Sequence, residues 1–74
     1  MLLRCWVDGI PYLTEVNRAF YKEGNVYFES DEIEVCIFGI TVSEWSVLAN
    51  DMFADNKLIL PRDKYSPRVW NRVK

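Results

Sequence analysis

The chain of 74 residues contains no histidine, only two cysteines, three glycines and three prolines. Without histidine, neither a Ser-His nor a Cys-His catalytic pair can form, and the commonest protein metal ligand is missing. The glycines are isolated and make no phosphate-binding loop. No apolar run approaches the length of a transmembrane helix. We therefore expect a protein that is not an enzyme, holds no metal or cofactor and does not bind a membrane.

The two cysteines, Cys5 and Cys36, lie in separate apolar stretches without the CxxC spacing of a zinc site. Free buried thiols are the simplest interpretation, and a disulfide between them is the alternative. A secreted chain of this size usually has more cysteines, so we expect a reducing, cytoplasmic setting. Arg4 interrupts the first apolar run, which argues against a signal peptide.

Hydrophobic residues make up 50% of the chain and aromatic residues 15%, which is high for a domain with room for one core. We assign Trp6 and Trp45 to this core. The remaining apolar surface is expected to be covered by a partner protein or by a second copy of the chain.

The segment 32–56 has the densest apolar content. Alternate residues in 33–37 are apolar, as in a strand, and the apolar spacing then changes to that of one helix stripe, formed by Trp45, Leu48, Ala49, Met52 and Phe53. Thr41 or Ser43 can cap the start of this helix, and Asn56 is a suitable end. The stripe is expected to pack against the sheet.

Residues 2–7 and 57–60 are also typical of strands, the second closed by a proline and suited to a sheet edge. Residues 12–22 fit either a strand or a helix, but their β-branched and aromatic content favours a strand. A Gly24-Asn25 turn would then lead into a return strand over 26–29.

These elements predict an α+β fold, a small antiparallel sheet of four to five strands in the order β-β-β-β-α-β with one amphipathic helix packed across it. A small half-open β-barrel with one helix is the alternative. We assign residues 1–61 to a single α+β domain and residues 62–74 to a basic, aromatic C-terminal tail.

Charge is unevenly distributed along the chain, although the net charge is only −2. Residues 23–56 contain eight acids and no base, whereas residues 57–74 contain six bases and one acid. This segregation fits either two opposed functional faces or a basic tail that folds back over an acidic sheet.

Four acids form the first candidate site: Glu29, Asp31, Glu32 and Glu34. On a strand, Glu32 and Glu34 would point the same way, and such an array could engage a basic groove by imitating nucleic-acid phosphates. Small acidic, histidine-poor inhibitors made by phages and mobile elements are similar in composition. Solvated turn carboxylates are the ordinary alternative, and carboxylate catalysis would need a cleft that so short a chain rarely provides.

The second candidate site is the tail, where five bases are interleaved with two aromatic residues: Arg62, Lys64, Arg68, Arg72 and Lys74 with Tyr65 and Trp70. Such a mixture can bind phosphates while it stacks on bases. Tryptophan and arginine are equally typical of protein interfaces. The ordinary alternative is that Trp70 covers the sheet of its own domain.

We expect a small non-enzymatic protein-binding module, of the kind that phages and mobile elements use as inhibitors or regulators. It would bind a larger protein through an acidic surface and a Trp/Arg tail: Glu29, Asp31, Glu32, Glu34, Arg68, Trp70 and Arg72. The alternative is a nucleic-acid-binding accessory protein that acts through the basic tail. A homodimer is a further partner that the apolar content allows.

Overall fold

The computed structural model describes residues 1–62 and 64–72. Within these residues it contains one helix and seven strands: β1 (Leu2–Val7), β2 (Ile10–Glu15), β3 (Arg18–Lys22), β4 (Asn25–Glu29), β5 (Ile33–Ile37), α1 (Val42–Asp55), β6 (Lys57–Ile59) and β7 (Arg68–Asn71). The predicted α+β class with one packed helix is confirmed. The strands form two sheets, however, where the sequence predicted one of four to five strands.

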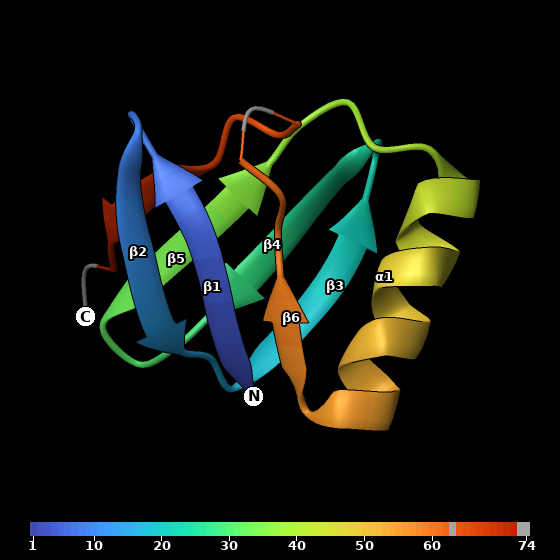
Figure 1. The fold of residues 1–74 in the computed structure, drawn as a ribbon, viewed down its shortest axis with the longest axis horizontal. Helices are drawn as coiled ribbons and strands as arrows, with labels where there is room; N and C mark the ends of the chain where they lie inside the picture. Colours follow the sequence, from blue (N-terminus) through green and yellow to red (C-terminus); the bar gives the residue numbers. More distant parts are fainter. Residues whose placement is uncertain (63, 73–74) are drawn as a thin grey trace.

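The first sheet has the strand order β2-β1-β6, and the second has the order β3-β4-β5-β7. β1 pairs antiparallel with β2 and parallel with β6, whereas every pair in the second sheet is antiparallel. Figure 1 shows the first sheet in front of the second, with α1 along one side, next to β6 and β3. The described strands do not close into a barrel.

Two hairpins use two-residue turns in which both residues have positive φ. These turns are Asp8-Gly9, with φ of 51° and 78°, and Glu23-Gly24, with φ of 52° and 81°. This geometry matches the right-handed twist of the flanking strands, and glycine adopts it without a steric penalty. The second turn therefore lies one residue earlier than predicted, and Asn25 begins β4.

The chain crosses from the first sheet to the second at Val16, which is only 1% exposed. Its amide donates a 2.8 Å hydrogen bond to the carbonyl of Met1. The strand prediction for residues 12–22 is correct in type, but this buried corner divides the segment into β2 and β3. The division shifts the alternation of side chains, so that Phe20 faces away from the core.

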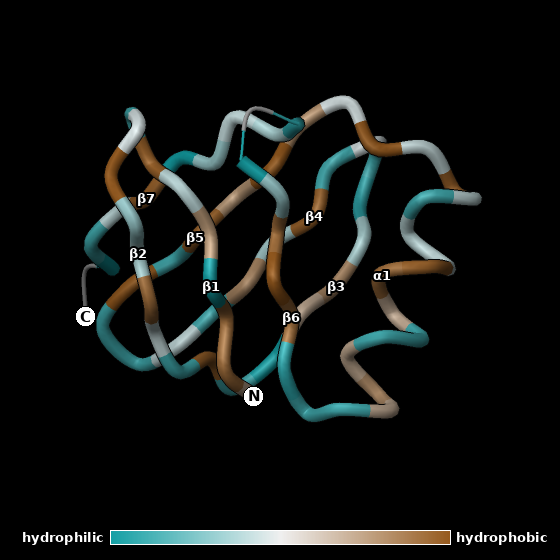
Figure 2. Tube along the Cα trace, in the orientation of Figure 1, coloured by the Kyte–Doolittle hydropathy of each residue, from teal (hydrophilic) through white to brown (hydrophobic). Residues whose placement is uncertain are grey.

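The core lies between the two sheets and is closed on one side by the helix. It contains apolar residues from both sheets, from the connections and from α1: Leu3, Cys5, Val16, Val26, Phe28, Val35, Ile37, Ile40, Leu48, Leu58 and Leu60. Figure 2 shows hydrophobic residues, in brown, along the strands of both sheets. Each large side chain buried here contributes about 1.5–3 kcal/mol to folding.

The ends of α1 are set by local hydrogen bonds, as the sequence predicted. The hydroxyl of Thr41 accepts from the amide of Glu44 at 3.1 Å, and the Glu44 carboxylate accepts from the Thr41 amide at 3.1 Å. Asn56 ends the helix in a left-handed conformation, and its amide donates to the carbonyl of Met52. No helix in the described part of the chain has the length and hydropathy to cross a membrane.

The predicted helix stripe is only partly buried. Leu48 lies in the core, with Trp45 and Met52 packed beside it, and the Trp45 ring stacks on Tyr21 at 6.1 Å. Phe53 is 94% exposed, so its assignment to the buried stripe is wrong. The reason is rotation, because five residues carry Phe53 about 140° around the helix from Leu48.

Candidate functional site

The C-terminal segment contributes strand β7 to the second sheet, next to β5. Trp70 lies opposite Glu34, and Arg68 lies opposite Cys36. Side chains of directly paired residues emerge on the same face of a sheet. One face therefore carries part of the acidic segment and part of the basic, aromatic segment. The sequence had presented these two segments as separate surfaces.

We call this the outer face, because it is the side of the second sheet that points away from the core. The registers of the four strands place on it the following residues, with Phe38 just beyond the end of β5: Arg18, Phe20, Lys22, Asn25, Tyr27, Glu29, Glu34, Cys36, Phe38, Arg68 and Trp70. A sheet that packs on a core with one face usually presents polar residues on the other. Here the open face carries four aromatic residues.

These aromatic residues pack in two pairs. Phe20 stacks on Tyr27 with ring centres 5.1 Å apart, and Phe38 meets Trp70 edge to face at 6.5 Å. The Arg18 guanidinium lies 4.6 Å from the centre of the Phe20 ring. Phe38 remains 46% exposed and Trp70 44% exposed. The sheet therefore holds these rings in fixed positions while leaving apolar area open to a partner.

Both cysteines are free and buried, which confirms the prediction for them. Cys36 is fully buried although it belongs to the outer face, because its neighbours on the face cover it. Burial raises the pKa of the Cys36 thiol, the charge of Glu34 raises it further, and a hydrogen bond with Tyr27 acts in the opposite direction. Burial also raises the pKa of Cys5. Raised pKa values disfavour the reactive thiolate in both cases.

Two carboxylates face each other across β4 and β5 on the outer face. Glu29 lies opposite Glu34 and forms an ion pair with Arg18, with 3.0 Å between Nε and Oε1. Burial raises the pKa of Glu34, as do its hydrogen bond to Glu29 and the negative charge of Glu29, while the charge of Arg72 lowers it. Ionisation of Glu34 is therefore less favourable on this part of the face than in water.

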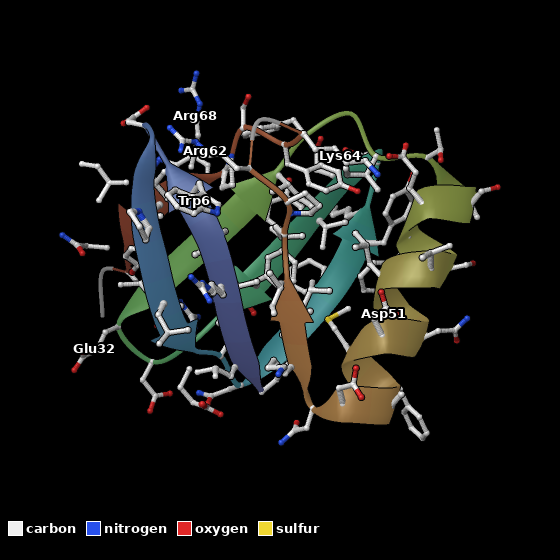
Figure 3. All side chains as sticks on the ribbon, in the orientation of Figure 1. Trp6, Glu32, Asp51, Arg62, Lys64 and Arg68 are labelled. Atoms are coloured by element: carbon white, nitrogen blue, oxygen red, sulfur yellow. The ribbon has the colours of Figure 1, made fainter. Side chains whose placement is uncertain are left out.

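The other two predicted acids, Asp31 and Glu32, lie in the turn between β4 and β5. The Asp31 carboxylate accepts a 3.1 Å hydrogen bond from the side-chain amide of Asn17. Both acids line a shallow depression of about 380 Å³ that also includes residues of β2. In Figure 3, Glu32 lies at the lower left, away from the labelled bases at the top. The four acids thus divide into a pair on the outer face and a pair in the turn.

Arg72 connects the end of β7 to this turn. Its guanidinium donates a 2.6 Å hydrogen bond to the carbonyl of Ser30, and its amide donates to the carbonyl of Glu32. Of the predicted residues, Glu29, Glu34, Arg68 and Trp70 therefore share the outer face. Arg72 fastens the neighbouring turn.

A groove of about 690 Å³ continues from Trp70 toward the first sheet. It runs between the β1-β2 turn and the segment 65–70, and it includes the side chains of Trp6, Tyr65 and Arg68. The Arg62 guanidinium lies 4.8 Å from the Trp6 ring centre. Figure 3 shows Trp6 close to Arg62 and Arg68, with Lys64 along the same upper side of the molecule.

The assignment of Trp6 to the core is wrong, because it is half-buried and lines this groove. It lies on the same outward side of β1 as Arg4. The charged side chain of Arg4, two residues earlier in the strand, could have indicated that Trp6 faces outward. Phe20 and Phe38 were also missed as surface residues. For Phe20 the signal was its place between Arg18 and Lys22 at alternate positions, which marks an outward-facing row.

No group of three or more potential metal ligands forms among the residues that the structure describes. Comparisons of the chain with protein-family models, with curated proteins and with solved structures found no match.

Proposed function

We propose that the protein is a non-enzymatic binding module that contacts a larger protein through the outer face of its second sheet. The observation that supports this most is the set of four aromatic side chains across that face, with no layer of the described chain packed over them. Exposed apolar patches with a polar rim are typical of protein-binding surfaces.

The charges on the outer face favour a protein as the partner. Two carboxylates, Glu29 and Glu34, lie among the aromatic rings and would repel phosphates. The ring of Phe20 is already covered by Arg18, which leaves less room for a stacked base. Arginine and tryptophan dominate the binding energy of many protein interfaces, and Arg68 and Trp70 are neighbours on this face.

The proposal includes an inhibitory or regulatory action on the partner, of the phage or mobile-element type expected from the composition, and a reducing, cytoplasmic setting. The two free, buried thiols are consistent with that setting. It also includes self-association as a second class of interaction, which the exposed apolar side chains support. An activity assay of the captured partner, with and without the protein, tests the inhibitory role.

The main test is capture of the partner from host cells, followed by calorimetry with the purified partner. We expect the double variant Trp70→Ser/Arg68→Glu to bind at least about 30-fold more weakly, because hot-spot residues contribute about 2 kcal/mol or more. The matched control is Leu13→Ser, since Leu13 is 62% exposed on a strand of the other sheet. Equal affinities for the wild type and the double variant would remove the outer face from the proposal.

The acidic turn provides a separate test. Reversal of both turn acids, in the variant Asp31→Lys/Glu32→Lys, should slow association with the captured partner and weaken its dependence on salt. Neither residue lies in the core, so the fold should be retained. If the association rate of this variant matches that of the wild type, the turn has no part in the interface.

A second candidate function is nucleic-acid binding through the groove. It is favoured by one observation, the gathering of Arg62, Lys64 and Arg68 around a groove that includes Trp6 and Tyr65. Titration with single-stranded and duplex DNA at increasing salt tests it, because phosphate binding must weaken steeply as salt rises. The absence of binding at low salt would exclude this function.

A further inference from the structure

β7 is the last strand of the second sheet, so one of its long sides has no described strand beside it. The amide of Arg72, directly after β7, donates to the carbonyl of Glu32, so these two residues form a hydrogen-bonded pair. Such pairs alternate with non-bonded pairs along an antiparallel ladder. Trp70 therefore directs its backbone groups toward β5, whereas Val69 and Asn71 direct their N–H and C=O groups away from it.

The other three edges of the described sheets are protected. β3 and β6 lie next to α1 (Figure 1), and β2 contains Pro11, which has no N–H group to offer. Covering elements and prolines both discourage an edge from pairing with another chain. Beside β7, in contrast, the groove of about 690 Å³ follows residues 65–70 and leaves space along the strand. An open edge with space beside it can accept one more strand.

The side chains of β7 define the chemistry of a strand that pairs with it. Arg68 and Trp70 belong to the outer face, and Val69 packs against the core. Because directly paired residues share a face, a carboxylate opposite Arg68 and apolar side chains opposite Val69 and Trp70 would fit. Arg68 forms no ion pair with a described residue. β7 itself contains no acid, so a second copy of this strand could not supply the carboxylate.

We propose that the larger partner places an extended segment beside β7, where it continues the second sheet through backbone hydrogen bonds to Val69 and Asn71. This segment carries an acidic residue opposite Arg68 and apolar residues opposite Val69 and Trp70. The inference rests on the proposed function, since it states how the partner reaches the outer face. Main-chain hydrogen bonds hold such a segment in place, and the side chains on its two faces select its sequence.

Amide hydrogen exchange, measured by nuclear magnetic resonance on the isotope-labelled protein with and without the purified partner, tests the proposal. The amides of Val69 and Asn71 should exchange at least about 100-fold more slowly in the complex, because new backbone hydrogen bonds protect them. Leu13 is the internal control, because its N–H also points away from the neighbouring strand, at the edge of β2. Unchanged exchange at Val69 and Asn71 in a complex that still forms would overturn the added strand and leave the outer face in place.

A proline variant provides an independent measurement. Asn71→Pro removes the outward N–H group, and a strand edge tolerates proline where that group faces solvent. The matched control, Asn71→Ala, keeps the N–H group. Calorimetry with the purified partner should give at least about tenfold weaker binding for Asn71→Pro than for Asn71→Ala. Equal affinities would overturn the proposal, and the exchange measurement on the wild type decides it if Asn71→Pro does not fold.

Two further outcomes separate this inference from its alternatives. If Val69 and Asn71 of the wild type exchange more slowly as the protein alone is concentrated, a second copy occupies the edge and the proposal is overturned. If Asn71→Pro and the double variant Trp70→Ser/Arg68→Glu both bind the partner as strongly as the wild type, the proposed function fails together with this inference. If only the double variant binds more weakly, the outer face is retained without the added strand.

Discussion

The two faces of the second sheet are built from the same strands but from different kinds of residue. Tyr27 and Phe28 are consecutive in β4, yet Phe28 is fully buried with other apolar side chains while Tyr27 belongs to the outer face. The inner face is apolar and uncharged at its centre, whereas the outer face mixes rings with arginines and carboxylates. The inner face therefore supplies the fully buried apolar side chains of this sheet, whereas the outer face leaves aromatic side chains partly exposed.

The largest expected effect is on the inner face. Phe28→Ala should lower the free energy of unfolding by about 3–5 kcal/mol, because it leaves a cavity between the two sheets. Since small domains have only about 5–15 kcal/mol in total, the variant should lose a large fraction of its stability. Guanidinium titration followed by circular dichroism measures the change. If the free energy of unfolding falls by less than about 1 kcal/mol, the inner face does not contribute more to stability than the outer face.

A smaller effect is expected one residue earlier in the chain. Tyr27→Ala should cost about 1 kcal/mol, the size of one cross-strand pair, because it removes the stacking partner of Phe20. It should also uncover Cys36 and speed its alkylation by iodoacetamide in the folded protein. The thiol of Cys5, between the sheets, serves as the internal control, and its alkylation rate should not change. If alkylation of both thiols becomes faster by the same factor, the substitution loosens the whole fold and does not specifically uncover Cys36.

The smallest effect concerns Glu34. Because its pKa is raised in the folded state, the folded protein holds a proton that the unfolded chain has lost above the ordinary glutamate value of about 4.3. Stability should therefore fall as pH rises from that value through the raised pKa. Glu34→Gln should remove this decline and increase stability at pH 7 by up to about 1 kcal/mol, with no gain at pH 3. Thermal unfolding at the two pH values checks the sign.

Local features of the fold could be predicted from the sequence. The helix boundaries at Thr41 and Asn56 follow from capping groups that act within a few residues, and the alternation in β5 marks its buried side directly. The division of residues 12–22 at Val16 could not be predicted, because it results from a tertiary contact that buries the corner. The parallel pairing of β1 with β6 was also hidden, since it joins segments about fifty residues apart.

The candidate site also depends on contacts between distant segments that the sequence does not reveal. Residue types alone indicated that Trp70, Arg68 and the acids were surface groups with binding potential. Their meeting on one face depends on the register between β5 and β7, which a single sequence does not reveal. Phe53 was misplaced for a different reason, because a stripe at helical spacing does not show which of its edges meets the core.

Neither sheet is assembled from neighbouring stretches of the chain alone. The first joins residues 2–15 to residues 57–59, and the second joins residues 18–37 to residues 68–71. A peptide ending in the turn at Asp31 would hold both hairpins but lack β6, β5 and β7, so neither hairpin would have its full set of partners. This peptide and the one that holds the rest of the chain should each stay unfolded when separate. They should recover the native circular dichroism spectrum only when mixed. A chain split at this turn would therefore report on any interaction that brings the two halves together.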